Sequence, residues 1–296
     1  MRLLVSFKLC PDLELLKKED IIVTEEMGID THFLPNIINC YDESALELVL
    51  RLRDKIKEGV VELSAFTVGG KQTELTLKGL RALGFLHTVR ADAEQEEIQF
   101  FPELVAETLA CYVKEHPQDC ILLGREAPAG NHGVMAQLVS EKLNCPSVGP
   151  VIDLMEMDEK SVTVLVSEGG SIQKQTIKLP CVLCVGNAVI SKLRIATLRE
   201  RMKVSKTESE NISLVYPDSR QMAKTGKDNS DKSKAPVLSN LENRKRSGTG
   251  CVAEWIAESV GANMKILFII HGIHNQVLEM ARKKKQVLSA KHGLYD

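Results

Sequence analysis

A short run from Asn39 to Asp42 brings an amide, a thiol, a phenol and a carboxylate together directly before an amphipathic segment. Asn39 and Asp42 are residue types that tolerate turn conformations and can cap a helix. Apolar side chains then recur at helical spacing, which predicts a helix. Because the run also follows a strand-like segment at residues 3–8, it predicts a ligand-facing turn between a strand and a helix N-terminus, for a ligand that these residues do not identify. The apolar positions are Leu46, Val49, Leu50 and Leu52, and those left for solvent are Glu43, Glu47 and Arg51.

A second candidate site is the glycine-rich loop at 124–133, which joins an apolar strand-like run to a helix-like one. Such a loop can turn several backbone N–H groups toward an anion, so it predicts phosphate binding. An ordinary strand-to-helix connection is the alternative, because the glycine spacing fits neither a P-loop nor the dinucleotide fingerprint. His132 either contacts phosphate or is a solvent-exposed loop histidine. The candidate binding residues are Gly124, Arg125, Gly130, Asn131, His132 and Gly133.

Val68 and Gly69 end another apolar run. Glycine lets a backbone approach a ligand closely, and a simple turn is the alternative. We find no Ser/His/Asp arrangement, no paired carboxylates and no cluster at metal-binding spacing, so the sequence predicts neither a catalytic residue nor a metal site.

Composition excludes several classes of protein. The chain has 296 residues, of which 44% are hydrophobic and 26% charged, which is typical of a globular protein. The formal net charge of −2 gives no basic field for nucleic acid. No apolar run reaches the ~20 residues of a membrane span, and the N-terminus is typical of a strand rather than a signal peptide.

The eight cysteines are scattered through apolar runs, which favours reduced thiols and a cytoplasmic location. Cys181 and Cys184 form a CxxC pair inside a strand-like run. We interpret this pair as structural, with a redox or metal role as the alternative.

The elements that must position these residues alternate between strand and helix through the first half of the chain. That alternation predicts an α/β fold, a Rossmann-like parallel sheet covered on both faces. Consecutive strand-like runs then predict an antiparallel meander. The predicted strands are 3–8, 60–68, 85–89 and 120–124, the helices are 75–83, 101–115 and 133–143, and the meander strands are 148–157, 161–167, 172–179 and 181–185.

The composition changes again near residue 206. We expect a nucleotide-binding α/β domain at 1–206, a polar linker or arm at 207–250, and a C-terminal helical segment at 251–296 that docks on a partner subunit.

Four segments, in order along the chain, resemble the electron transfer flavoprotein β subunit. Residues 39–52 are similar to its Asn-Pro-aromatic-(Asp/Cys)-x-x-Ala-x-Glu-x-x-x-Arg-Leu segment, with Cys40 at the usual proline. Residues 5–8 resemble its opening strand, and Leu-Leu-Gly-Arg-Glu-Ala at 122–127 resembles the strand that enters its phosphate loop. Residues 178–199 are similar to its Lys-Leu-Pro strand and recognition loop, with Leu193 at the second proline.

The resemblance implies an electron-carrier subunit without its own substrate turnover. Such subunits pair with a FAD-binding α subunit and carry electrons between flavin dehydrogenases, such as acyl-CoA dehydrogenases, and a downstream acceptor. Tyr41 then faces the isoalloxazine, and the 124–133 loop holds AMP or a second FAD. This loop is about two residues shorter than the family's and lacks its aspartates. The implied cofactor contacts outside that loop are Ser6, Asn39, Cys40, Tyr41, Asp42, Val68 and Gly69.

The resemblance also implies partner contacts. The family's recognition loop anchors a dehydrogenase through an exposed leucine, near which Ile190 falls; internal packing of Ile190 is the alternative. We also assign Arg194, Arg244 and Trp255 to partner binding, the last two in a C-terminal segment that wraps onto the α subunit.

Three alternatives stay open. A second FAD would make the chain part of an electron-bifurcating flavoprotein. A stand-alone adenine-nucleotide sensor of the universal-stress-protein type would be a homodimer that binds ATP without flavin. A scaffold subunit would have lost its nucleotide.

Overall fold

The computed structural model describes residues 1–17, 20–22, 30–56, 60–93, 98, 101–128, 133–204 and 206–216. The chain divides into two compact units, one of which comprises Met1–Leu13 and Leu34–Met222. The sheet, the helices and the site described below all belong to that unit.

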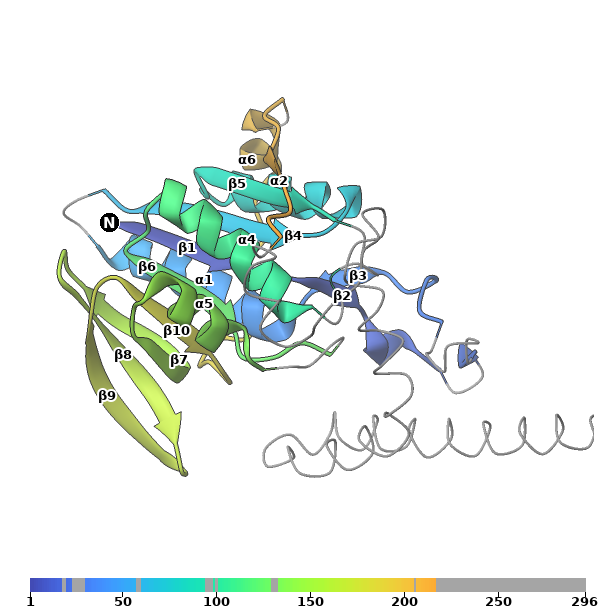
Figure 1. Ribbon diagram of the computed structural model, residues 1–296. Helices are drawn as coiled ribbons and strands as arrows, with labels where there is room; N and C mark the ends of the chain where they lie inside the picture. Colours follow the sequence, from blue (N-terminus) through green and yellow to red (C-terminus); the bar gives the residue numbers. More distant parts are fainter. Residues whose placement is uncertain are drawn as a thin grey trace, which may run out of the picture. The chain divides into compact units, whose positions relative to one another are not determined.

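Nine strands form one sheet in the order β11-β5-β4-β1-β6-β10-β7-β8-β9 (Figure 1). Neighbours from β11 to β7 pair in parallel, and β8 and β9 extend the sheet as antiparallel strands. A separate antiparallel pair joins β2 (Leu9–Pro11) to β3 (Asn36–Ile38). The strands of the large sheet are β1 (Arg2–Ser6), β4 (Glu62–Val68), β5 (His87–Asp92), β6 (Cys120–Gly124), β7 (Ser147–Met157), β8 (Ser161–Glu168), β9 (Ser171–Lys178), β10 (Cys181–Val185) and β11 (Glu210–Ser213).

Helices cover both faces of the parallel part of the sheet (Figure 1). One core joins α1 and α2 to one face, and a second joins α4 and α5 to the other. The predicted α/β class, a Rossmann-like sandwich with a parallel sheet, is therefore confirmed. The helices are α1 (Cys40–Lys55), α2 (Glu74–Ala82), α4 (Pro102–Glu115), α5 (Met135–Leu143) and α6 (Leu198–Lys203), with single 3₁₀ turns η1 (Leu13–Leu15) and η3 (Lys71–Thr73).

Local sequence explains why these elements form where they do. Strand β6 is apolar and buried along Cys120–Leu123, as expected for a strand covered on both faces. Pro102 occupies the first turn of α4, where its missing N–H costs no hydrogen bond. A capping box, in which Thr197 and Glu200 satisfy each other's backbone N–H groups, begins α6.

The meander is shorter than the sequence predicted. Strands β7, β8 and β9 do form antiparallel pairs. Strand β10 instead returns to the main sheet and lies in parallel between β6 and β7. All five of its residues are buried, which suits a central position with both faces covered, whereas β9 is largely exposed and suits an edge.

The CxxC pair lies within β10. Cys181 belongs to the core on the α1 side of the sheet, and Cys184 to the core on the α4 side. Their side chains point to opposite faces, because residues three apart in a strand alternate in direction. The two thiols therefore cannot bind one metal ion, which supports the structural interpretation. The cysteines among the described residues are all free thiols.

Strand β11 pairs with β5 at one edge of the sheet, beyond residue 206, where the sequence places the end of this domain. The arm and C-terminal segment expected at 207–250 and 251–296 lie outside the described residues from 217 onward. Among the helices that the structure describes, none combines the length and apolarity needed to cross a bilayer.

Candidate functional site

The candidate site lies at the carboxyl ends of β1 and β6. The chain runs from β1 through α1 to β4 on one side, and later returns from β5 through α4 to β6 on the other. The strand order therefore reverses between β1 and β6. Open α/β sheets bind ligands outside the strand ends at such a reversal. This edge is where the sequence placed Ser6, the Asn39–Asp42 turn and Gly124.

A buried carboxylate joins the two strand ends at this edge. Asp42, in the first turn of α1, is 5% exposed. Its Oδ2 accepts the backbone N–H of Lys8, just after β1, at 2.9 Å. Its Oδ1 accepts the backbone N–H of Gly124, at the end of β6, at 2.8 Å. Asp42 thus fixes the N-terminus of α1 against both strands and satisfies two backbone donors that the sheet leaves free.

The capping role expected of Asn39 and Asp42 is not what the structure shows. Asn39 occupies the N-cap position of α1, but its side chain makes no capping hydrogen bond. Its Nδ2 instead donates to the backbone oxygen of Glu126 at 2.8 Å. Both side chains therefore hold the turn to neighbouring strands and loops. Sequence reasoning assigned no role to Lys8 or Glu126, because these two hydrogen bonds use backbone groups, the Lys8 N–H and the Glu126 carbonyl, which residue type does not reveal.

Burial dominates the electrostatics of Asp42. It raises the pKa of this carboxyl to about 6, against the opposing effect of hydrogen bonds from the Lys8 N–H, the Asn39 side chain and the Gly124 N–H. Burial also lowers the pKa of Lys8. At neutral pH the site holds a buried carboxylate stabilised mainly by backbone dipoles.

Gly124 must be a glycine for this arrangement to form. A Cβ at this position would overlap Asp42 Oδ1, and it would lie 2.9 Å from Tyr41 Cβ and 3.0 Å from the Asp42 backbone nitrogen. No rotamer change relieves a contact with backbone nitrogen. The close approach of β6 to the N-terminus of α1 therefore depends on the absent side chain.

Tyr41 and Cys40, in the same turn, are more exposed than Asp42. Tyr41 is half-buried, and its hydroxyl lies 3.4 Å from Glu126 Oε1. Burial and the neighbouring Glu126 carboxylate raise the pKa of the Tyr41 phenol, so it stays neutral. Cys40 is exposed. Arg125 is exposed as well, and its backbone N–H is held by the Val185 carbonyl at 2.8 Å. The edge thus combines an aromatic ring and a cation around a rigid backbone.

The end of β4 completes the edge. Ser6 pairs in register with Phe66 of β4 and Leu123 of β6. Val68 ends β4, and the Gly69 N–H donates to the Ala91 carbonyl at 3.0 Å. Ser6, Val68 and Gly69 therefore lie along the same edge of the sheet as the Asn39–Asp42 turn.

The glycine-rich loop is described only at its two ends. Gly133 has a φ of +63°, a conformation that favours glycine. Gly130, Asn131 and His132 lie outside the described residues. Their assignment to phosphate binding stays a prediction.

The residues assigned to partner binding have different surroundings. Ile190 is half-buried, whereas Val189 and Ile195 are 58% and 82% exposed. Arg194 is paired within the chain, with Glu47 and Asp54 of α1. Arg244 and Trp255 lie outside the described part of the chain.

Glu47 is the clearest correction to the sequence reasoning about α1. The helical pattern left it for solvent, but it is 6% exposed. It is buried because Arg194, 147 positions away in the sequence, covers it. No local pattern could reveal so distant a partner.

The fold and the edge between β1 and β6 define an α/β protein of the Rossmann-like class. Residues 26–215 match the family described as the electron transfer flavoprotein domain. The chain belongs to this family, and the resemblance drawn from residues 39–52 and 178–199 is confirmed.

Individual relatives agree. The chain is 26% identical over 211 residues to the putative electron transfer flavoprotein subunit YgcR of Escherichia coli (strain K12), covering 70% of this chain and 80% of the relative. It is 28% identical over 196 residues to the electron transfer flavoprotein subunit beta of Bacillus subtilis (strain 168), covering 66% and 74%. It is also 28% identical over 194 residues to the caffeyl-CoA reductase-Etf complex subunit CarD of Acetobacterium woodii, covering 62% and 68%.

Proposed function

We propose that this chain is the β-type subunit of an electron transfer flavoprotein. In this proposal it pairs with a FAD-binding α-type subunit and carries electrons between flavin dehydrogenases, such as acyl-CoA dehydrogenases, and a downstream acceptor. One observation carries the proposal furthest. The Asn39–Asp42 turn, which resembles the family's flavin-facing segment, is locked onto the ends of β1 and β6 by Asp42. An aromatic side chain is thereby held at the edge where this fold class binds ligands.

The residues at the edge fit a flavin and an adenine nucleotide. In the proposal, the half-buried ring of Tyr41 covers one side of the isoalloxazine, with Asn39, Cys40 and Asp42 forming the rest of that wall. Ser6, Val68 and Gly69 lie against the adenosine, where Gly69 offers a backbone without a side chain. Bound FAD would supply the electron-accepting and electron-donating chemistry. The chain's own part is to orient the rings and exclude water, since the protein tunes a chemistry that belongs to the cofactor.

Phosphate binding is proposed for the glycine-rich loop, with Gly124, Arg125 and Gly133 at its described ends. Arg125 is exposed and can approach an anion. The nucleotide there is AMP for a simple shuttle or a second FAD for a bifurcating protein. The second alternative draws on the similarity to CarD, which is named as part of a caffeyl-CoA reductase-Etf complex.

Cofactor content tests the proposal directly. The full chain is co-expressed with its α-type subunit, the complex is purified, and FAD and AMP are extracted and quantified. One FAD and one AMP per heterodimer are the expected result for a shuttle, and two FAD are expected for a bifurcating protein. A chain that forms no yellow complex and binds ATP alone would overturn the proposal in favour of a nucleotide sensor.

Tyr41 gives a sharper test of the flavin wall. Tyr41→Ala is expected to raise the dissociation constant of the flavin by roughly tenfold, because the ring's stacking surface is lost. Tyr41→Phe keeps the ring and removes only a long hydroxyl contact of 3.4 Å, so flavin affinity is expected to change little. Each complex is diluted serially into buffer, and the flavin that is released is followed by its fluorescence. This gives the dissociation constant of the flavin for each protein. Equal affinity in all three proteins would show that this ring does not cover the flavin.

A further inference from the structure

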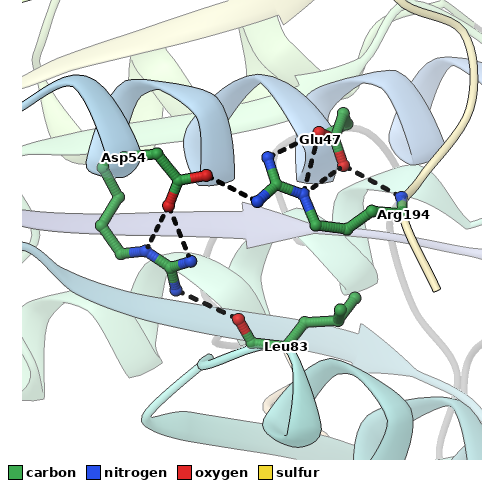
Figure 2. A network of polar contacts seen from close by, with 5 residues as sticks. Glu47, Asp54, Leu83 and Arg194 are labelled. Atoms are coloured by element: carbon green, nitrogen blue, oxygen red, sulfur yellow. Dashed lines mark hydrogen bonds and ion pairs between the residues drawn. The ribbon is translucent and has the colours of Figure 1, made fainter. Parts of the chain in front are cut away.

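Residues 186–196, here called the recognition segment, contact α1, and Arg194 makes most of the side-chain contacts between them. The Nε atom of Arg194 donates to Glu47 Oε1 and Oε2 at 3.0 and 3.1 Å, and Nη2 donates to Oε1 at 2.8 Å. Nη1 donates to Asp54 Oδ2 at 2.5 Å. Figure 2 shows the guanidinium between these two carboxylates of the same helix. A planar guanidinium with two bound carboxylates has little freedom to rotate.

The main chain of the segment is bound by the same helix. Glu47 Oε2 also accepts the backbone N–H of Arg194 at 3.0 Å. Glu43 Oε1 accepts the backbone N–H of Leu193 at 3.1 Å. Glu43 and Glu47 are four residues apart and so lie on one face of α1, together with Asp54. These carboxylates bind the second half of the segment. The first half is joined to β7 by backbone hydrogen bonds, from the Gly186 N–H to Val151 and from the Val189 N–H to Ile152.

The network continues to a second helix. Asp54 Oδ1 accepts Arg53 Nη2 at 3.0 Å, and Arg53 Nη1 donates to the Leu83 carbonyl at the end of α2 at 3.1 Å (Figure 2). Asp54 is therefore itself held in place. The helix that binds the recognition segment is thus itself bonded to the end of α2, which packs on the same face of the sheet.

Two features make this fastening relevant beyond stability. The residue after Arg194, Ile195, is 82% exposed, and Val189 near the start of the segment is 58% exposed. Apolar side chains on a rigid loop suit contact with another protein. Glu43 also directly follows Asp42 in the first turn of α1, so one helix binds the segment and forms the turn at the candidate ligand edge.

We propose that Arg194 is a positioning residue, which holds the recognition segment on α1 in the conformation that a partner flavoprotein binds. The inference rests on the proposed function, since it takes that partner to be the electron donor or acceptor. Without the fastening, the segment occupies its binding conformation only part of the time. The apparent affinity for the partner then falls by that fraction.

The first experiment is amide hydrogen exchange on the full chain assembled with its α-type subunit, comparing wild type with Arg194→Met. Exchange at Leu193 and Arg194, whose N–H groups donate to the α1 carboxylates, is expected to accelerate by about tenfold or more, while exchange in the sheet strands stays unchanged. Arg199→Met is the matched control, because Arg199 is exposed and makes no ion pair among the described residues. Unchanged exchange in Arg194→Met would overturn the positioning role, whatever the function of the protein.

The second readout is steady-state electron transfer from a reduced partner flavoprotein. Arg194→Met is expected to raise the KM for that partner about tenfold and to leave kcat within about twofold. Arg194→Lys keeps the charge without the planar fork and is expected to fall between Met and wild type. Accelerated exchange with an unchanged KM would overturn the link to the partner.

A double variant distinguishes the loss of positioning from misfolding. Arg194→Met alone leaves Glu47 buried and unpaired, so Glu47→Gln/Arg194→Met removes both charges together. The double variant is expected to fold and to bind flavin like wild type, yet to show the same raised KM. Failure of the proposed function would appear separately, as a wild-type complex without flavin.

Discussion

Replacement of Gly124 with alanine is expected to lower the free energy of unfolding by about 2–3 kcal/mol and to abolish flavin binding. The added methyl group would overlap the Asp42 carboxylate, the Tyr41 Cβ and the Asp42 backbone nitrogen. Relief requires the N-terminus of α1 to move away from the end of β6. That movement breaks the hydrogen bond between the Gly124 N–H and Asp42, and it displaces Tyr41 from the ligand edge.

Denaturant unfolding and flavin content measure the two effects. Gly79→Ala is the matched control, because it is the same chemical change at a position where a Cβ meets nothing within 4 Å. Gly79 lies inside α2, so alanine there is expected to stabilise the chain by about 0.5–1 kcal/mol. A Gly124→Ala protein with wild-type stability and full flavin content would show that the close approach of α1 to β6 is not required.

The fold could be predicted from the sequence wherever burial leaves a local pattern. The apolar run at Cys120–Gly124 predicted a buried strand, and the helical spacing after Asp42 predicted a helix with one buried face. Both patterns arise because buried positions recur at the period of the strand or helix and are filled by apolar residues. The same logic explains the error at Cys181–Val185. An apolar run identifies a buried strand, but its neighbours in the sheet are set by topology that no short window contains.

The sequence located the candidate site but did not reveal the contacts that join its parts. Residue types placed the Asn39–Asp42 turn and Gly124 among ligand-binding candidates, and the structure brings them together at one edge. The contact between Asp42 and Gly124 joins residues 82 positions apart. The other partner of Asp42 is the backbone N–H of Lys8, just after β1, which no side-chain type reveals. The Glu47–Arg194 pair was not predicted either, because its residues are 147 positions apart and a glutamate on a helix is most often solvated.

Asp42 provides the second large effect, one with a distinctive dependence on pH. Asp42→Asn is expected to lower the free energy of unfolding by about 2–3 kcal/mol at about pH 4. At that pH the carboxyl is protonated, yet each of its oxygens can still accept one of the two N–H groups, those of Lys8 and Gly124. Asn carries only one acceptor, so its amide N–H₂ faces one of these two donors. One buried backbone donor then loses its partner.

The loss is expected to shrink as the pH rises. Burial raises the pKa of Asp42 to about 6 in the folded chain, from 3.8 in the unfolded one. The folded chain therefore binds the proton more tightly, and the stability that this contributes is fully present below about pH 4 and lost as the pH passes 6. Asparagine does not titrate, so the difference in unfolding free energy, wild type minus Asp42→Asn, falls across that window.

Urea unfolding of both proteins at intervals between about pH 4 and 7 gives this difference. Asp119→Asn is the control, because Asp119 also accepts a backbone N–H, that of Arg2 at 2.7 Å, at the other end of β1. A difference that grows with pH would mean that the hydrogen bonds to Asp42 outweigh its burial and lower its folded pKa. A difference that falls would show that the buried carboxylate is kept at an energetic cost. Such a cost is expected where stability is given up for a site, here the attachment of the Asn39–Asp42 turn to the ends of β1 and β6.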